Sequence, residues 1–576
     1  MRTYITFAMR SWRFLTPGTR RKFISLSPLL LLGAIGELVA VLALGALTAV
    51  AFRVSTNDSR PTRIEILVDR YFPLELSSQQ LILLLVSSSI FLLASKTSFM
   101  MFVNFKVANF LAEEEALISS RIFNKLLTSS IDDGFEKSSG EYQYLILSAT
   151  SRLMNSVMLP LLNLSSDIFT VFFLVLTAVL VSPITGMGLL FLILLIYVSL
   201  NKILGRKSHV YGELIAGDSI RITDLISASI RGRKELRVYQ VSDYLINSFT
   251  KSRSRLARVV QRSNLINGIF RFVADLVILL LGVFILAVQL LIEVDLRRIV
   301  SILILYLAIG YRLLPAIQRV QGTLTSLRLS RPALEPLLDS TSFNFSQPSD
   351  ETLKVKRSSV VEPASVVMRD LSFEYISENV KSKKLIHNLN LQLAPGKLLV
   401  LWGRSGSGKT TLLDILAGLR KPTCGIIRYE NSRGEAVDNI AKSYVGQEPF
   451  LSKGKLTESL LLGLEIEDNS ISELKRIFGA LNLEGAINDL DSFELLENST
   501  NVSGGEKQRL SIARALAIPS SIVFMDEPTS ALDQKNHDSV IKLIESQIGN
   551  KTMIIATHDQ QIKFLADEVI SLGDAK

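Results

Sequence analysis

The sequence predicts a chain in two parts: a multi-pass α-helical membrane domain with six transmembrane helices, followed by a soluble α/β domain. Three observations support this prediction. The 576 residues exceed the length of one ordinary domain. Hydrophobic residues make up 48 % of the chain, and long apolar segments recur up to residue 320. Beyond that point, a glycine-rich loop between an apolar strand and a helix indicates an α/β fold.

Six apolar segments each approach the ~20 residues that a helix needs to cross a bilayer. They are expected at 27–51, 80–104, 155–181, 185–204, 265–291 and 298–320. The first 26 residues carry six basic residues and no acid, which predicts a cytoplasmic N-terminus by the positive-inside rule. No small-residue cleavage site follows as in a signal peptide. An even number of crossings then leaves the second domain in the cytoplasm as well, beneath the cell membrane.

The links between the segments predict where the membrane domain reaches the cytoplasm. The links 105–153 and 205–263 are charged, and apolar residues recur in them at helical spacing, so helices are expected to continue beyond the bilayer. Short turns are expected near 132–134 and 227–233. The outer loop is expected to hold a short amphipathic helix around 63–71, either on the outer leaflet or packed on the bundle.

Charged residues inside an apolar segment cost free energy, so each needs a reason. Seven are present: Glu37, Lys96, Asp167, Arg271, Asp275, Arg312 and Arg319. One interpretation is a structural ion pair or a snorkelling end residue. The other is a polar substrate cavity, for which Glu37, Arg271, Asp275 and Arg312 are the candidates. In that case, Arg271 and Arg312 are expected to hold an anionic head group.

Prolines with clustered serine and threonine predict a linker between the two parts. The prolines that follow residue 331 are expected to interrupt helices. The domains are therefore expected at 1–325 for the membrane part and 366–576 for the α/β part, with the linker at 326–365.

The glycine-rich loop has the spacing of a phosphate-binding P-loop. Its predicted nucleotide-binding residues are Gly403, Arg404, Ser405, Gly406, Ser407, Gly408, Lys409, Thr410 and Thr411. Glycines let backbone N–H groups turn toward phosphate oxygens, and the following helix N-terminus adds partial positive charge. Lys409 is expected to reach the β- and γ-phosphates, and the Thr410 hydroxyl to ligate Mg²⁺. A glycine turn without function does not account for the full spacing.

A second apolar strand, at 521–525, ends in the acids Asp526 and Glu527. Asp526 is expected in the Mg²⁺ shell, and Glu527 is expected to polarise the attacking water. Two acids after a strand are a weak signal alone and a strong one downstream of a P-loop.

At this point the sequence resembles the ATP-binding cassette (ABC) family. The stretch 502–509 is similar to the family signature, and 527–533 is similar to its Walker B exit and D-loop. His558 matches the switch histidine, Gln447 matches the Q-loop, and Tyr375 matches the aromatic residue that stacks on adenine. These motifs occur in the family's order over roughly 210 residues.

The resemblance implies that two such domains enclose two ATP molecules. Ser503, Gly504 and Gly505 of one chain would face the γ-phosphate that Lys409 of the other holds. Glu506 would complete the signature site, where it replaces a more frequent glutamine, and Val502 replaces the usual leucine. His558 would act with Glu527 in catalysis, and Gln447 would sense Mg²⁺.

Six spans before one ATPase domain resemble an exporter-type ABC half-transporter, most simply a homodimer. The membrane part resembles bacterial lipid-linked oligosaccharide flippases, which implies an amphipathic, lipid-linked substrate and contact with membrane lipids; Asp275 stands where that family has glutamate. A peptide or hydrophobic-drug exporter and an ATP-gated channel or regulator remain alternatives. The net charge of +9 does not indicate nucleic acid, because much of it flanks apolar segments. The single cysteine, Cys424, excludes an internal disulfide and a multi-cysteine metal site.

Overall fold

A computed structural model describes most of the chain and divides it into two compact units, one up to Gln347 and the other from Pro348 onward. The described residues are 2–56, 78–128, 138–181, 183–291, 296–338, 361–377, 380–437, 440–462, 468–483, 493–496 and 499–573. The expected outer helix at 63–71 and the expected turn at 132–134 lie outside these ranges.

In its described residues the first unit contains helices joined by short turns, and no strand. It opens with α1 (Arg2–Phe14). Its helices of 23 residues or more are α2 (Pro17–Thr56), α4 (Ser78–Thr128), α7 (Leu159–Val181), α8 (Pro183–Arg231), α10 (Ser242–Leu291) and α11 (Leu296–Leu338). By length and composition, two described segments qualify as membrane spans, Ile82–Thr128 and Ser139–Leu180. A count of six spans therefore stays a prediction, although each predicted segment falls within this helical unit.

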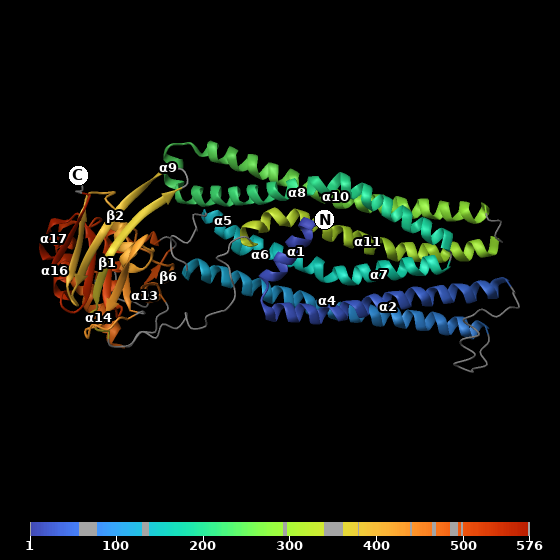
Figure 1. Ribbon diagram of the computed structural model, residues 1–576, viewed down its shortest axis with the longest axis horizontal. Coiled ribbons are helices and arrows are strands. Elements are labelled where there is room, and N and C mark those ends of the chain that lie inside the picture. The colour runs from blue at the N-terminus through green and yellow to red at the C-terminus, as the bar shows by residue number, and fades with distance from the viewer. Residues whose placement is uncertain are drawn as a thin grey trace. The chain divides into compact units, whose positions relative to one another are not determined.

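The long helices pack in pairs that Figure 1 shows side by side: α2 with α4, and α8 with α10. α11 packs against both α7 and α8. Glycine allows a close approach between α8 and α11, because a Cβ added at Gly212 would lie 2.4 Å from the Leu329 carbonyl oxygen.

α8 ends at Arg231, and the chain turns at Gly232 and through the short helix α9 (Arg233–Val238) before α10 begins, which confirms the turn expected near 227–233. The expectation that the prolines after residue 331 interrupt helices was wrong. α11 runs through Pro332 and Pro336 to Leu338, so the first residues of the expected linker are helical. The proline cost is offset by burial, because Ala333, Leu334 and Leu337 are at most 1 % exposed.

The approach to α7 is wound more loosely than an α-helix. It consists of α5 (Ser139–Gln143), the π-helical η1 (Tyr144–Ala149), α6 (Thr150–Arg152) and the π-helical η2 (Leu153–Met158). The wider turns bury a continuous apolar face. At the start of α5, Asp224 of α8 accepts hydrogen bonds of 2.9 Å from Ser138 Oγ and from the Gly140 amide.

In its described residues the second unit is an α/β domain with three sheets. The strands are β1 (Ser365–Ser377), β2 (Val380–Leu393), β3 (Leu398–Gly403), β4 (Cys424–Glu430), β5 (Lys442–Val445), β6 (Gly454–Lys455), β7 (Glu494–Leu495), β8 (Ile522–Asp526), β9 (Thr552–Thr557) and β10 (Glu568–Leu572). The central sheet is parallel, in the order β10-β3-β9-β8-β5. An antiparallel sheet has the order β2-β1-β4, and β6 pairs with β7.

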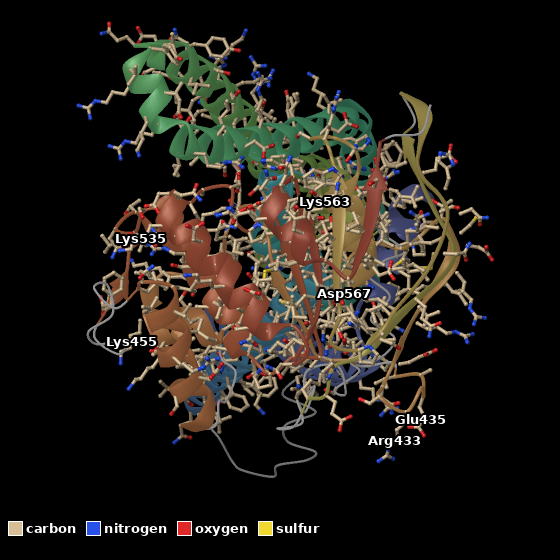
Figure 2. The ribbon with its side chains drawn as sticks, turned by 90° about the vertical axis from the view of Figure 1, so that its left-hand side faces the viewer. Arg433, Glu435, Lys455, Lys535, Lys563 and Asp567 are labelled. Carbon is tan, nitrogen blue, oxygen red and sulfur yellow. The ribbon has the colours of Figure 1, made fainter. Side chains whose placement is uncertain are left out.

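Helices connect the strands of this unit. They are α12 (Lys409–Ala417), α13 (Leu456–Leu461), α14 (Asp468–Ala480), α15 (Gly504–Ala517), α16 (Gln534–Gln547) and α17 (Gln560–Leu565). The strands β3, β8 and β9 are buried on both faces, which explains their continuous apolar sequence. Asp567, labelled in Figure 2, accepts hydrogen bonds from Lys397 Nζ and from the Leu398 amide, so it fastens β10 to the start of β3.

Candidate nucleotide site

The predicted P-loop lies at the carboxyl end of β3 and leads into α12. Gly406 and Gly408 have φ values of +78° and +100°, which glycine adopts without strain. Gly408 also lacks room for a side chain, because an added Cβ would lie 2.6 Å from Cδ2 of Leu385. Leu385 belongs to β2, so the antiparallel sheet covers one side of the loop.

Lys409 is the buried cation of this loop. Its side chain is 7 % exposed, its Nζ donates a hydrogen bond of 2.8 Å to the Gly403 carbonyl, and Nζ lies 3.1 Å from Glu527 Oε1. The lysine therefore lies beside the carboxylate of Glu527, the residue that directly follows β8.

Asp526 and Thr410 form the second part of the site. The Thr410 hydroxyl donates a hydrogen bond of 2.9 Å to Asp526 Oδ2. Burial raises the pKa of Asp526, and the Thr410 hydrogen bond opposes that shift. Asp526 Oδ1 is buried without a hydrogen-bond partner. A buried carboxylate oxygen beside a hydroxyl oxygen is the donor chemistry that Mg²⁺ prefers, so these two residues fit a magnesium ion.

Glu527 is held from several sides. Its Oε2 lies 2.8 Å from His558 Nδ1 and accepts a hydrogen bond of 3.4 Å from Thr557. Its φ of +48° is unusual for a residue with a Cβ, and its amide donates to the Ala556 carbonyl at 2.8 Å. β8 and β9 thus bring together two residues that lie 31 positions apart in the sequence.

A pocket of about 310 Å³ opens over these groups. It is lined by Leu385, Arg404, Ser405, Gly406, Gly408, Lys409, Thr410, Thr411, Gln447 and Glu527. Sequence reasoning included all of these except Leu385, which pairing between distant strands brings to the site. Gly403 and Ser407 are not among the lining residues, and a Cβ added at Gly403 would lie 2.6 Å from Ser407 Oγ. The Tyr375 side chain is outside the described residues.

The signature residues Ser503, Gly504, Gly505 and Glu506 are not among the residues that line this pocket. They form the start of α15, where the Ser503 hydroxyl accepts from the Glu506 amide and the Glu506 carboxylate accepts from the Ser503 amide. The hydrogen bonds that the Ser503 amide and hydroxyl donate to the Glu506 carboxylate lower the pKa of Glu506. Gly505 allows close packing, because an added Cβ would lie 3.1 Å from the Ala531 carbonyl. The signature helix is therefore packed against the segment that follows Glu527.

A hydrogen-bonded network next to this segment was missed by sequence reasoning. Asp559, directly after His558, accepts from Thr529 Oγ1 at 2.9 Å and lies 2.5 Å from His537 Nε2. Burial works against both charged forms, but hydrogen bonds outweigh it. Those from His537, Thr529 and the Gln561 amide lower the pKa of Asp559, and those to Asp559 and Asp538 raise the pKa of His537. The spacing of these residues carries no sequence signal, because three different elements supply them.

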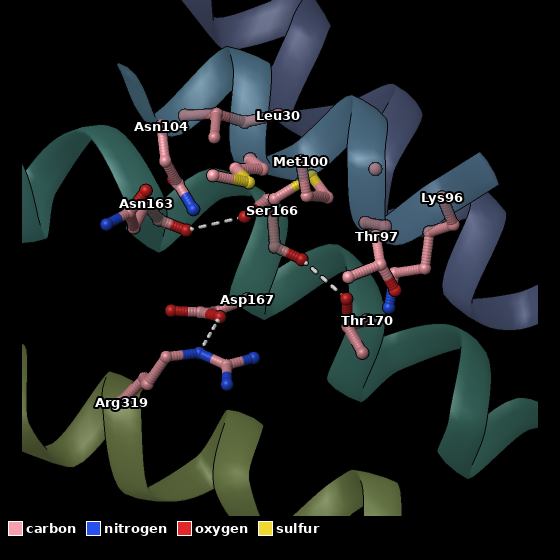
Figure 3. A pocket seen from close by; sticks show the side chains of 13 residues that line it. Leu30, Lys96, Thr97, Met100, Asn104, Asn163, Ser166, Asp167, Thr170 and Arg319 are labelled. Atoms are coloured by element: carbon pink, nitrogen blue, oxygen red, sulfur yellow. Dashed lines mark hydrogen bonds and ion pairs between the residues drawn. The ribbon is translucent and has the colours of Figure 1, made fainter. Parts of the chain in front are cut away.

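All four residues expected to line a substrate cavity belong to the helical unit. The side chains of Glu37, Arg271 and Asp275 are outside the described residues. Arg312 is half-buried on α11 and does not line the cavity found in the helical unit. That cavity, of about 670 Å³, lies between α2, α4, α7 and α11, and it contains an ion pair of 2.6 Å between Arg319 Nε and Asp167 Oδ1 (Figure 3).

Comparisons with known proteins bear on both units. Residues 386–530 match the ABC transporter family model. The chain is 29 % identical over 211 residues to the mycobactin import ATP-binding/permease protein IrtB of Mycolicibacterium smegmatis, covering 36 % of this chain and 37 % of that protein. It is 31 % identical over 220 residues to the macrolide export ATP-binding/permease protein MacB of Rhodopseudomonas palustris, covering 37 % and 33 % respectively. The matches thus span about a third of each relative.

A solved structure extends the likeness to the whole chain. It is described as a bacterial Atm1-family ABC exporter with ATP bound, and it matches with a TM-score of 0.74 at 18 % identity, covering 97 % of this chain and 94 % of that one. At this identity the likeness establishes the fold. Residues 386–530 thus match the ABC transporter family, and the chain as a whole has the fold of the exporter in that solved structure.

Proposed function

We propose that the protein is an ATP-driven membrane transporter that acts as a homodimer. The observation that carries the proposal is the convergence of a lysine, two carboxylates, a hydroxyl and a histidine at the carboxyl edge of one parallel sheet. A site of this composition suits phosphoryl transfer, in which the protein positions the phosphates and neutralises developing charge.

Each residue has a role in the proposed hydrolysis of ATP. Lys409 binds the β- and γ-phosphates, and Thr410 with Asp526 holds Mg²⁺, which neutralises phosphate charge when bound. Glu527 accepts a proton from the attacking water while the bond from the γ-phosphorus to the bridging oxygen breaks. His558 is 71 % exposed on its side chain and lies beside Glu527, where it can contact the γ-phosphate.

The site needs a second copy of the chain, because the start of α15 does not line the pocket of its own chain. A helix N-terminus favours an anion, so the Ser503–Gly505 segment of a partner copy suits the open side of the phosphates. The proposed dimer can be tested by cross-linking. In a Cys424→Ser background, Ser405→Cys with Ser503→Cys is expected to give covalent dimers with a short thiol cross-linker in the presence of ATP. The matched control, Ser503→Cys alone, is expected to stay monomeric on a denaturing gel, and equal dimer yields would contradict the arrangement.

The proposed cargo is an amphipathic molecule, preferably a lipid-linked oligosaccharide, moved across the cytoplasmic membrane by alternating access. ATP drives such a cycle only if it binds one conformation better than the other. The polar cavity between otherwise apolar helices supports an amphipathic cargo. The relatives do not determine the direction of transport, since one is described as an importer and another as an exporter.

Transport is tested in proteoliposomes. Labelled lipid-linked oligosaccharide is expected to change leaflet with ATP and not with the Glu527→Gln variant. If this lipid neither crosses nor stimulates ATP turnover while a peptide or hydrophobic drug does both, the cargo assignment is wrong and the transporter assignment stands. If no candidate stimulates turnover and ATP evokes single-channel currents, the transporter assignment is wrong as well.

A further inference from the structure

The histidine beside the proposed base is not fixed by its own packing. His558 Nδ1 lies 2.8 Å from Glu527 Oε2, yet the His558 side chain is 71 % exposed. An exposed side chain keeps much of its rotamer freedom, so its direction depends on how the backbone on either side is held. Thr557, on one side, donates a hydrogen bond of 3.4 Å to Glu527 Oε2. The residue on the other side is Asp559, and it makes more contacts than Thr557.

Asp559 fixes the backbone around His558 and joins it to the segment that follows β8. Its Oδ1 accepts a hydrogen bond of 2.9 Å from the Gln561 amide at the start of α17, and its own amide donates one of 3.0 Å to Thr557 Oγ1. Its Oδ2 accepts one of 2.9 Å from Thr529 Oγ1. The segment that carries His558 is therefore connected to the segment after β8 at a second point, besides the contact between the two catalytic side chains.

His537 of α16 adds a third element to this contact. Its Nε2 lies 2.5 Å from the same Oδ2 of Asp559, and the His537 side chain is 17 % exposed. An ionised carboxylate only accepts hydrogen bonds, so Nε2 is the donor. α16 is a rigid support, because Val540, Leu543 and Ile544 bury its inner face in the core. Two donors from different elements thus converge on one carboxylate oxygen and fix its direction.

Capping of α17 does not account for this arrangement. A capping carboxylate needs one oxygen for a backbone amide near the helix start. Asp533 caps α16 in that way, and both of its carboxylate oxygens bond to Asn536. Asp559 uses Oδ1 as a cap, and its Oδ2 binds the side chains of Thr529 and His537. The second oxygen therefore connects the segment after β9 with the segment after β8 and with α16.

We propose that Asp559 and His537 are positioning residues that hold His558 beside Glu527 for the hydrolysis of ATP. Neither residue lines the nucleotide pocket, so they act through His558 and not through contact with phosphate. This role rests on the proposed function, which assigns the hydrolysis to Glu527. It adds that the direction of His558 depends on α16, a helix that contributes no side chain to the pocket lining.

The test uses the two nitrogens of the imidazole. Glutamine can place its amide nitrogen near the position of His537 Nε2, whereas asparagine reaches only the position of Nδ1. In the full chain in nanodiscs, His537→Asn is expected to lower kcat for ATP about tenfold and to leave KM unchanged. The reason is that a misplaced group costs transition-state stabilisation and not ground-state binding. His537→Gln is the matched control and is expected to keep most of kcat.

Thr529 supplies a second variant that leaves the imidazole in place. Thr529→Val keeps the shape of the side chain, removes the other donor to Asp559 Oδ2 and should also lower kcat, and Thr529→Ser should restore it. Wild-type kcat in both His537→Asn and Thr529→Val overturns the proposed role, and so does a raised KM at constant kcat. An equal loss of kcat in His537→Asn and His537→Gln also overturns it, because the loss then belongs to packing of the ring.

Amide hydrogen exchange reports on the same segment without catalysis. In the nucleotide-free samples, residues 557–562 are expected to exchange about tenfold faster in His537→Asn than in wild type, since a hydrogen bond to a charged group shifts a local equilibrium by about that factor. His537→Gln should exchange as wild type does, and equal exchange in all three proteins overturns the proposed role. If wild type hydrolyses no more ATP than Glu527→Gln, the proposed function fails, while the exchange comparison still decides whether His537 holds this segment.

Discussion

Replacing Glu527 with glutamine isolates the chemical step from nucleotide binding. Glutamine keeps the shape of the side chain, which is 12 % exposed, and can keep contacts to Thr557 and His558. The backbone at Glu527 is fixed by its own amide, which donates to the Ala556 carbonyl. The substitution therefore removes the negative charge and the proton acceptor without opening a cavity.

The expected loss can be estimated from this geometry. A positioned general base contributes about 10²- to 10⁴-fold in rate, which corresponds to about 3 to 5 kcal/mol of the barrier. Glu527→Gln is therefore expected to slow ATP turnover by about that factor. Binding of ATP should not weaken, because the variant removes a carboxylate that lies 3.1 Å from Lys409 Nζ and competes with phosphate for it.

Phosphate release measures turnover, and fluorescence of a labelled nucleotide measures binding. Glu545→Gln is the matched control, since Glu545 is an exposed glutamate on α16. Turnover within a factor of about three of wild type in Glu527→Gln would refute the role of this residue as base. A variant that no longer binds nucleotide would refute the claim that the two steps separate.

Three further predictions follow from the same domain. Thr410→Val should raise the Mg²⁺ concentration that gives half-maximal turnover by about 10- to 100-fold, because it removes the hydroxyl beside Asp526. A Mg²⁺ titration of turnover measures this, and Thr410→Ser should restore the wild-type concentration. His537→Asn should lower the unfolding midpoint more at pH 6 than at pH 9. The raised pKa of His537 means that its contact with Asp559 stabilises the fold below ~6.5 and is lost as the pH rises through the folded value; an equal effect at both pH values would contradict this. Phe524→Ala, at a fully buried position of β8, should cost about 3 to 5 kcal/mol in denaturant unfolding of the domain, and a loss below about 1 kcal/mol would be inconsistent with its burial.

Local chemistry explains why the nucleotide site could be predicted from the sequence. The P-loop supplies Gly406, Gly408, Lys409 and Thr410 within five positions, so spacing alone predicts their neighbourhood. The parallel strands that end at the site are short, apolar and buried on both faces, which also makes them visible in the sequence.

Contacts between distant segments could not be predicted in this way. Asp167 and Arg319 are 152 positions apart, and each was singled out only as a charge inside an apolar segment. Leu385 reaches the phosphate loop through a strand of another sheet. α11 shows a different failure of local prediction. It continues through Pro332, because burial of the neighbouring residues outweighs the tendency of proline to end a helix.

The paired π-helical segments η1 and η2 affect how the helical stretch that leads into α7 tolerates changes in length. A residue advances an α-helix by about 100°, so a one-residue deletion within α8 would rotate everything beyond it out of register with its neighbours. A π-turn already holds one residue more than an α-turn. A deletion at Ile146 or at Asn155 can therefore be absorbed by tightening the local coil, which leaves the flanking faces aligned. This stretch is where natural or engineered shortening of the helix would do least harm.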